Sequence, residues 1–422
     1  MREPLSFYQV FVRNCSAEGT LKRVEYDLNR IKAMGFDYVY LLPVHPIGEK
    51  GRKGTYGSPY AIADYDAVDP DLGTMDDFLD LVHAAHARGL KVMMDIVLHH
   101  SAADHPWVKK HPSWYAKENA VADWSDVRDF NFESEELRET LLDSLLHWVE
   151  DGVDGFRCDV ASLVPLSFWK DLRSRAKMLN PQFVMLAESV ESPFVLWMRS
   201  KGIDALSDGE LAQAFDDLYP YTVREEMEDA VTHSNLVPYE KAVNQLLASL
   251  PSSTREIWYL ENHDRKRIYS LLNENETKFR NWLAWSFFMP GDAFVYNGQE
   301  AYAIHQPSLF EKDPIDWSKR DQKLEETIAA YNRMRRKMMG QIRCGFFIEN
   351  DAMFETALYG ETETFAGLYN VRGRGGLLHT HLKNDEYLNV LTGKPVTITD
   401  GDVAADALPA LLKISPDSWN RQ

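Results

Sequence analysis

Gly155-Phe156-Arg157-Cys158-Asp159 is the stretch around which the rest of the chain can be organised. It follows the apolar Val153 and predicts a short buried strand. Arg157 and Asp159 stand two positions apart, so in a strand their side chains point to the same side and emerge together at its carboxyl end. A guanidinium beside a carboxylate favours the ionised form, which a nucleophilic aspartate requires. A structural ion pair at a strand end is the alternative.

Buried strands alternate with amphipathic helices on both sides of this stretch. Helices are predicted over 21–34, 75–88, 164–179, most of 215–250 and 322–339, and Thr74 with Asp77 forms a capping box for the second of them. Eight β/α units predict an α/β fold, a closed parallel (β/α)8 or TIM barrel, rather than an open sheet. Its strands are expected at 6–13, 38–44, 91–98, 155–160, 183–188, about 203–211, 257–260 and 293–296.

The pattern divides the chain into three parts. Residues 1–100 and 132–339 are predicted to form the barrel. A polar, aromatic segment over 101–131 interrupts it after the third strand as a short inserted subdomain. After Gly340, short alternating apolar runs broken by glycines replace the helical periodicity. They predict a small C-terminal antiparallel β-domain, a β-sandwich, over 340–422.

The composition narrows the classes of partner. A formal net charge of −19 over 422 residues argues against nucleic acid and anionic membranes. Cys15, Cys158 and Cys344 are widely spaced and suggest neither a disulfide framework nor a metal site. The N-terminal residues lack an apolar run of signal-peptide length, and no segment is apolar enough to span a bilayer. We therefore expect a soluble, cytoplasmic protein whose oligomeric state the sequence leaves open.

Ionisable side chains gather at the predicted carboxyl ends of the strands, where the active sites of such barrels lie. Taken singly, an acid there could be a helix cap or a surface charge, and a histidine could be a buried structural residue. Their convergence on one barrel mouth favours an active site. The set comprises Asp95, His99, His100, Arg157, Asp159, Glu188, His263 and Asp264.

These residues carry a resemblance to the α-amylase family of glycoside hydrolases (glycoside hydrolase family 13). The resemblance extends from about Phe7 to Trp317 and includes Gly57-Ser-Pro-Tyr-Ala-Ile-Ala-Asp-Tyr65 and Met289-Pro-Gly291. Four motifs in order are a specific signal, whereas any one alone would be weak. They read Asp95-Ile-Val-Leu-His-His100, Gly155-Phe-Arg-Cys-Asp159, Leu186-Ala-Glu-Ser189 and Glu261-Asn-His-Asp264.

The resemblance implies a catalytic trio. Asp159 would be the nucleophile, Glu188 the general acid and then the general base, and Asp264 would hold hydroxyls of the distorted sugar ring. A two-carboxylate retaining mechanism needs one protonated acid beside a charged one. Arg157 stands two residues from Asp159, whereas the sequence places no such partner beside Glu188, which fits that division.

The resemblance also implies supporting and substrate-binding residues. Arg157 would orient Asp159, and Asp95 would hold Arg157. His100 and His263 would bond hydroxyls of the sugar that is cleaved, and Tyr60 would stack beneath it.

Two departures from the family pattern bear on metal and substrate. His99 stands where many members carry an asparagine that binds a structural calcium, and Ca²⁺ prefers oxygen ligands. Asp129 keeps the acid of another family motif, but one ligand does not make a site, so we expect no cofactor and disfavour calcium. Ser162-Leu163 replaces a Lys-His pair that often lines an acceptor subsite, which weakens the case for a typical endo-amylase unless Leu163 simply packs.

Residues 101–115, with 45–48 and 52–54, are similar to bacterial maltosyltransferases that use maltose 1-phosphate. Lys50, Arg52 and Lys53 could then meet a phosphate, although such a basic cluster is more often a solvated loop. Aromatic faces suit the apolar faces of sugar rings. The tryptophans of the insertion are therefore either sugar platforms or packing residues: Trp107, Trp114 and Trp124.

The leading hypothesis is a retaining hydrolase of α-glucosidic bonds in malto-oligosaccharides and α-glucans, which makes an oligosaccharide the expected partner. A transglycosylase of the same chemistry, a maltosyltransferase or glucanotransferase, is the alternative. A non-catalytic sugar-binding barrel is the third reading, disfavoured because both Asp159 and Glu188 are present. Chain-length and linkage preference cannot be read from the sequence.

Overall fold

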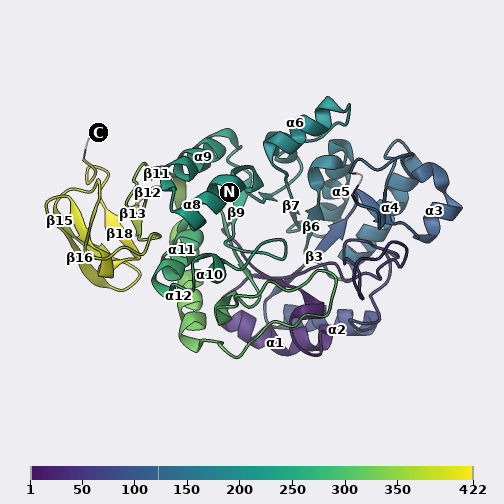
Figure 1. The fold of residues 1–422 in the computed structure, drawn as a ribbon, viewed down its shortest axis with the longest axis horizontal. Coiled ribbons are helices and arrows are strands. Elements are labelled where there is room, and N and C mark those ends of the chain that lie inside the picture. The colour runs from purple at the N-terminus through teal and green to yellow at the C-terminus, as the bar shows by residue number, and fades with distance from the viewer. Residues whose placement is uncertain (1, 122, 421–422) are drawn as a thin grey trace.

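Eight parallel strands close into a barrel in a computed structural model that describes residues 2–121 and 123–420 (Figure 1). Residues 1, 122, 421 and 422, which the predicted domains include, lie outside it. Pairing of the first and last barrel strands closes the ring, and the predicted TIM barrel is confirmed. The strands are β1 (Ser6–Val10), β2 (Tyr38–Leu41), β3 (Lys91–Val97), β6 (Gly155–Asp159), β7 (Val184–Ala187), β8 (Asp217–Leu218), β9 (Arg255–Trp258) and β10 (Asp292–Tyr296).

Helices surround the barrel strands. The helix α2 (Met75–Ala87) begins at the predicted capping box, because Thr74 and Asp77 each bond the other's backbone N–H. No described helix is both long and apolar enough to cross a membrane. The other helices of the barrel region are α1 (Leu21–Ala33), α4 (Glu135–Glu150), α5 (Leu166–Leu179), α6 (Ser192–Ser200), α7 (Asp208–Leu211), α8 (Arg224–His233), α9 (Leu236–Ser249), α10 (Ile268–Leu271), α11 (Glu276–Phe288) and α12 (Gln322–Met339).

The sixth barrel strand differs from the prediction. The apolar residues near Ile203 and Ala205 do not form a strand but pack beside Leu163 and Met198. The strand is the two-residue β8, whose Asp217 pairs with both neighbouring strands, and it lies where a helix was predicted. Two residues are too few to show a periodicity, whereas the longer α8 and α9 that follow do show one.

The inserted segment packs on the carboxyl end of β3. Its strands β4 (His100–Ala102) and β5 (Val127–Asp129) are antiparallel and place His100 opposite Asp129. The helix α3 (Pro106–Lys110) lies between them in sequence. Trp107 stacks on Tyr65 with ring centroids 5.5 Å apart, which favours packing over a sugar platform for this tryptophan.

Short 3-10 turns complete the connections of the chain. They are η1 (Val12–Asn14), η2 (Pro112–Trp114), η3 (Ala161–Leu163), η4 (Tyr221–Val223), η5 (Gln299–Ala301) and η6 (Ala405–Ala407).

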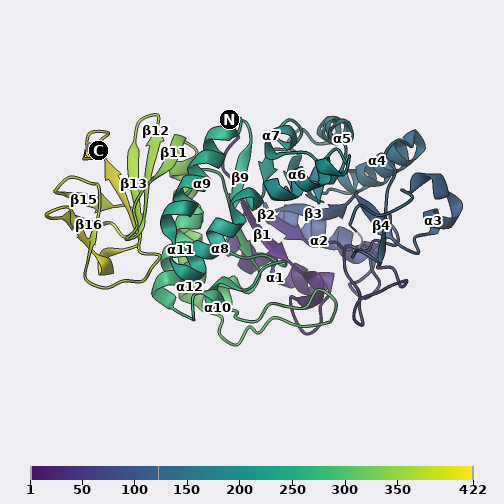
Figure 2. The same cartoon turned by 45° about the horizontal axis from the view of Figure 1, so that its top comes forward.

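A C-terminal antiparallel β-region lies beside α9 and α11, at the end of the molecule opposite α3 (Figures 1 and 2). The Asn244 side chain exchanges two hydrogen bonds with the Phe347 backbone, and the Trp285 and Phe347 rings stack 6.2 Å apart. The main sheet has six strands and β14 pairs with β17 beside it. The strands are β11 (Ile342–Ile348), β12 (Phe354–Gly360), β13 (Thr364–Tyr369), β14 (Leu377–His379), β15 (Asp385–Asn389), β16 (Lys394–Ile398), β17 (Asp402–Ala404) and β18 (Ala410–Ile414).

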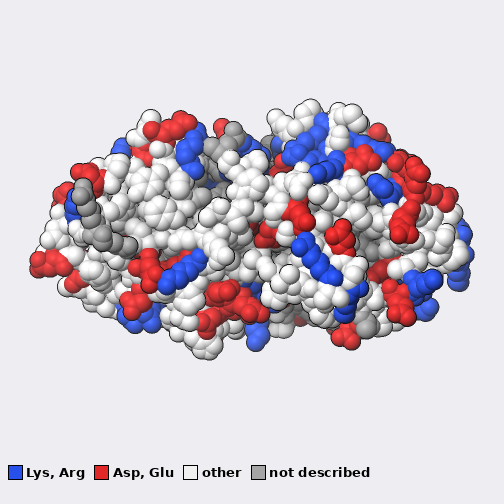
Figure 3. Space-filling model, turned by 90° about the horizontal axis from the view of Figure 1, so that it is seen from above, with Lys and Arg blue, Asp and Glu red and all other residues white. Residues whose placement is uncertain are grey.

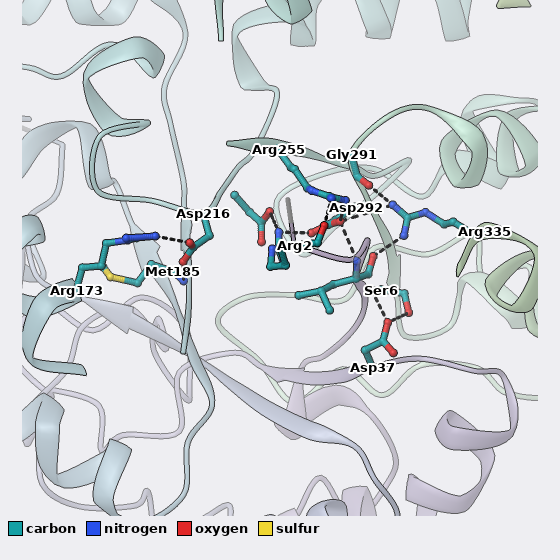
Figure 4. A network of polar contacts seen from close by, with 12 residues as sticks. Arg2, Ser6, Asp37, Arg173, Met185, Asp216, Arg255, Gly291, Asp292 and Arg335 are labelled. Atoms are coloured by element: carbon teal, nitrogen blue, oxygen red, sulfur yellow. Dashed lines mark hydrogen bonds and ion pairs between the residues drawn. The ribbon is translucent and has the colours of Figure 1, made fainter. Parts of the chain in front are cut away.

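A buried ionic cluster closes the amino-terminal end of the barrel (Figure 4). Arg2 pairs with Asp217 on β8 and with Asp292 on β10. Arg255 lies 3.3 Å from the Asp292 carboxylate, and Arg335 of α12 lies 3.7 Å from it. In this fold the amino-terminal face serves stability, whereas the opposite face carries the active site.

Candidate active site

Strand ends of the barrel and the inserted segment surround one cavity of about 440 Å³, which we call the catalytic pocket. Six of the predicted site residues line it: Tyr60, His100, Asp159, Glu188, His263 and Asp264. The remaining two, Asp95 and Arg157, are fully buried and contact the pocket residues. On the face shown in Figure 3, acidic and basic side chains are interspersed.

The Arg157 guanidinium joins three carboxylates. Its Nη1 donates to Asp95 Oδ1 at 2.8 Å and to Asp159 Oδ1 at 2.9 Å, while Nη2 lies 2.8 Å from Glu188 Oε1. The expectation that Glu188 lacks a cationic partner is therefore wrong. β6 and β7 are adjacent in the barrel, so Glu188, one residue beyond β7, stands beside Arg157 despite 31 positions of sequence separation.

Burial shifts the protonation equilibria of this group. The pKa of Asp159 is raised well above its ordinary value by burial and by the nearby Glu188 carboxylate, against the opposing effect of Arg157. Burial also raises the pKa of Asp95 to about 6, again opposed by Arg157. One guanidinium does not balance three buried carboxylates, so the group favours holding a proton.

A strained backbone segment fixes the second oxygen of Glu188. Val160, directly after β6, has φ 41° and ψ 44°, a left-handed conformation that β-branched residues rarely adopt. Its N–H donates to Glu188 Oε2 at 2.8 Å, while the Glu188 N–H donates to the Cys158 carbonyl. Both oxygens of Glu188 are thus held by the strand that carries Asp159.

Tyr60 and His263 form one wall of the pocket. The Tyr60 hydroxyl donates to Asp95 Oδ2 at 3.0 Å and lies 2.5 Å from His263 Nε2. The two rings stack with centroids 5.4 Å apart, and His263 Nε2 lies 3.2 Å from Asp264 Oδ2. Burial lowers the pKa of His263 to about 3 and raises that of Asp264. His263 is therefore neutral near pH 7.

Comparison with family models shows the family of the chain. A family model described as "Alpha amylase, catalytic domain" matches residues 4–128 and 122–357. The chain belongs to the α-amylase family. A second model, "Bacterial Alpha amylase C-terminal domain", matches residues 353–412. The resemblance seen in the four motifs is confirmed.

Solved structures of α-amylases align with nearly the whole chain. An α-amylase from Lactobacillus plantarum is 37% identical with a TM-score of 0.91, over 97% of this chain and 99% of that one. A maltogenic α-amylase from Thermotoga neapolitana is 28% identical with a TM-score of 0.83, over 97% and 98% of the two chains.

Curated relatives carry the name of a transferase. The α-1,4-glucan:maltose-1-phosphate maltosyltransferases of Arcanobacterium haemolyticum and Mycobacterium tuberculosis are both 35% identical, over 224 and 221 residues. Each match covers 44% of this chain but only 32% and 31% of the relatives. The chain thus spans about a third of the length of these relatives.

Sequence reasoning missed several residues of this α-amylase-family site. Tyr40 on β2 donates to Asp95 Oδ2 at 2.8 Å, and Gln9 on β1 places Nε2 3.3 Å from His263 Nδ1. Both are alternate strand residues, so strand periodicity could have marked them as facing the barrel interior. Gln306 donates to the His263 carbonyl at 3.1 Å. It lies in the loop after β10, where no periodicity or motif in the sequence marks it as a site residue.

The residues at the family's calcium position do not fit calcium. His99, His100 and Asp129 each offer one ligand atom, and these atoms lie within 4.8 Å of one another. Two of the three donors are imidazole nitrogens, whereas Ca²⁺ takes six to eight oxygen ligands. The sequence had marked His99 and Asp129 separately, and the fold adds His100 to them.

The basic loop that resembles maltosyltransferases and the departing residue Leu163 both make local contacts. The Arg52 guanidinium donates to the carbonyls of Gly48 and Ile47 in its own loop, and Lys53 pairs with Asp126 at 3.3 Å. Leu163 is 8% exposed and packs in an apolar cluster, which agrees with the alternative that this residue serves packing.

Proposed function

We propose that the protein is a retaining hydrolase that cleaves α-glucosidic bonds in malto-oligosaccharides and α-glucans. One observation carries the proposal. Asp159 and Glu188 line the same pocket, and each contacts a different terminal nitrogen of the Arg157 guanidinium. Retaining enzymes need two carboxyl groups close together, one as nucleophile and one as proton donor.

The reaction proceeds in two displacements. Glu188 gives its proton to the glycosidic oxygen while an oxygen of Asp159 attacks the anomeric carbon, and the bond to the leaving sugar breaks. The product of this step is a glycosyl ester on Asp159. Glu188, now ionised, takes a proton from a water whose oxygen attacks the same carbon, which releases Asp159 and restores the starting protonation.

The other residues of the pocket bind the sugar or stabilise the charge of the Asp159 carboxylate. Asp264 accepts hydrogen bonds from ring hydroxyls, and His100 and His263 bond further hydroxyls. Arg157 stabilises the Asp159 carboxylate as it forms and leaves, and Asp95 holds Arg157 from behind. Tyr60, stacked on His263, presents its ring to the sugar.

Replacement of the nucleophile tests the proposal. Asp159→Asn keeps the shape of the side chain but removes its negative charge, so hydrolysis of maltotriose should fall by about 10⁴-fold or more. The exposed Asp66→Asn serves as the matched control and should hydrolyse maltotriose at the unchanged rate. Undiminished hydrolysis by Asp159→Asn, in a variant that melts like the parent protein, would exclude the mechanism.

Transglycosylation is the second candidate, favoured by the names of the curated relatives. In that reaction a sugar hydroxyl replaces water in the second step. Hydrolysis is preferred because the solved α-amylases align with 97% of this chain, whereas the maltosyltransferase matches cover 44% of it. In the basic loop, Arg52 is bonded to its own loop, and a phosphate at Lys53, which lines the pocket, would compete with Asp126.

A product profile separates the two reactions. With maltotriose, starch, pullulan and maltose 1-phosphate supplied in turn, we expect shorter malto-oligosaccharides from maltotriose or starch and no release of phosphate from maltose 1-phosphate. Phosphate release coupled to longer glucan products would instead identify a maltosyltransferase.

A further inference from the structure

His99, His100 and Asp129 form a buried group of nitrogen and oxygen donors next to the catalytic pocket, outside the acid–base machinery. All three residues are at most 6% exposed. His99 and His100 follow β3, and the antiparallel register of β4 and β5 sets Asp129 directly opposite His100. Directly opposed residues in such a pair lie on the same face of the sheet with Cβ atoms about 4.5–5.5 Å apart. The backbone therefore brings the carboxylate to the imidazoles.

One donor atom from each of the three residues lies within 4.8 Å of the other two, so small side-chain shifts would let one small cation bridge them. His99 Nδ1 and His100 Nδ1 lie 3.1 Å apart. Two ligands at zinc–nitrogen distances of about 2.0–2.1 Å in a tetrahedral site stand about 3.3–3.4 Å from each other. Asp129 Oδ2 lies 3.6 Å from the other ring nitrogen of His99, Nε2. One ion can use only one nitrogen of His99, so the Asp129 carboxylate must turn toward the two Nδ1 atoms to share an ion with them.

Only one oxygen of the Asp129 carboxylate has a hydrogen-bond partner among the described residues. Its Oδ2 accepts the N–H of Ala120 at 2.6 Å, but its Oδ1 is buried and has no hydrogen-bond partner among the described residues. Burial of an ionisable oxygen without a partner costs stability unless a cation or a proton compensates it.

We propose that His99, His100 and Asp129 bind one Zn²⁺ ion, or a similar divalent transition metal that prefers imidazole, in place of calcium. Imidazole suits zinc and its neighbours in the transition series, whereas calcium needs a cage of oxygens. A water would complete four-coordination. The Trp124 ring lies edge-on to both imidazoles, with centroids 5.9 and 5.4 Å away, and shields the group from solvent.

Such a metal would couple the inserted segment to the pocket. It would join Asp129 of β5 to the residues that end β3, and it would fix the ring of His100, which lines the catalytic pocket. His100 would use Nδ1 for the metal and keep Nε2 for a sugar hydroxyl. The ion itself takes no part in bond cleavage.

Metal binding can be measured without substrate, so the result does not depend on the proposed hydrolysis. Full-length protein is freed of metal with a chelator and titrated with Zn²⁺ by calorimetry, with metal content read by elemental analysis and melting temperature by calorimetric scanning. We expect one equivalent of Zn²⁺ and a higher melting temperature, and no such response to Ca²⁺ at the same concentration.

Substitutions of two donor residues locate the ion. His99→Asn and Asp129→Asn should each weaken Zn²⁺ binding by about tenfold or more, the size of effect that even outer partners of a metal site have. His83→Asn removes an exposed imidazole of α2 and should bind Zn²⁺ as the parent does. Co²⁺ absorption in the visible range reports the same site in the parent protein, should a variant fail to fold.

Two results would overturn the assignment. One is a parent protein that binds no stoichiometric Zn²⁺ and gives no Co²⁺ absorption. The other is equal binding by the parent and by folded His99→Asn and Asp129→Asn proteins, which would show an adventitious ion only. In either case the 3.1 Å contact between the two Nδ1 atoms is a hydrogen bond between the imidazoles.

Discussion

Arg157 is the residue on which the electrostatics of the candidate site depend. Among the described residues it is the one buried cation that touches Asp95, Asp159 and Glu188, and it has no exposed surface. The proposed mechanism requires a proton on Glu188 when Asp159 attacks, whereas Arg157 and the Val160 N–H both hold the oxygens of Glu188 in this structure.

The acid limb of the pH–rate profile follows from this arrangement. In the proposed mechanism Asp159 attacks only when ionised, and its pKa is raised above the ordinary value of 3.8. The value of kcat/KM for maltotriose should therefore begin to fall, as pH is lowered, at a pH clearly above 3.8. A profile that stays flat down to pH 3.8 would show that the pKa of Asp159 is not raised in the protein.

At the scale of elements, β6 depends on the absence of a side chain at its first residue. A Cβ atom on Gly155 would lie 2.7 Å from the Val184 carbonyl oxygen of β7 and 3.0 Å from Met93 Cε. The glycine therefore lets β7 approach β6 closely, and that approach brings Glu188 to Arg157. The motif glycine serves packing rather than a turn.

Overpacking at this position should destabilise the barrel. Gly155→Ala is expected to lower the free energy of unfolding by about 1–3 kcal/mol in urea titrations. Gly209→Ala is the control, because a Cβ there meets nothing within 4 Å in α7. Equal effects of the two substitutions would mean that β7 can move away from β6 at no cost.

Elements with strong local patterns were predictable from the sequence, whereas pairwise geometry was not. The continuous apolar runs predicted β2 and β3, and the capping box predicted the start of α2. β8 did not, because a two-residue strand has no periodicity. The four motifs located Asp159 and Glu188, but the bond from Arg157 to Glu188 depends on adjacent strands. The same limit applies to His100 and Asp129, which only the β4–β5 register brings together.

At the scale of the whole molecule, the C-terminal β-region and the barrel share aromatic packing. Phe354 of β12 is fully buried, with ring centroids 5.0 Å from Trp282 and 5.7 Å from Trp285 of α11. Asn244 of α9 adds its two hydrogen bonds to Phe347. The interface resembles the interior of a single core, so the two parts should unfold together.

Loss of one interface ring tests this coupling. Phe354→Ala should lower the free energy of unfolding by about 3–5 kcal/mol, as for other buried phenylalanines, and should shift a single calorimetric transition. Phe346→Ala removes a phenylalanine that is 37% exposed on β11 and should change stability little. Two separate transitions, with only one moved by Phe354→Ala, would show that the parts unfold independently.

The ionic cluster at the closed end of the barrel has a consequence for synthesis on the ribosome. Arg2 leaves the exit tunnel long before its partners Asp217 and Asp292 have been made. At about 5–20 residues per second, the wait for Asp292 lasts about 15–60 s. During that interval β1 has β2 on one side and a free edge on the other. The nascent chain must keep that edge unpaired until the last barrel strand arrives.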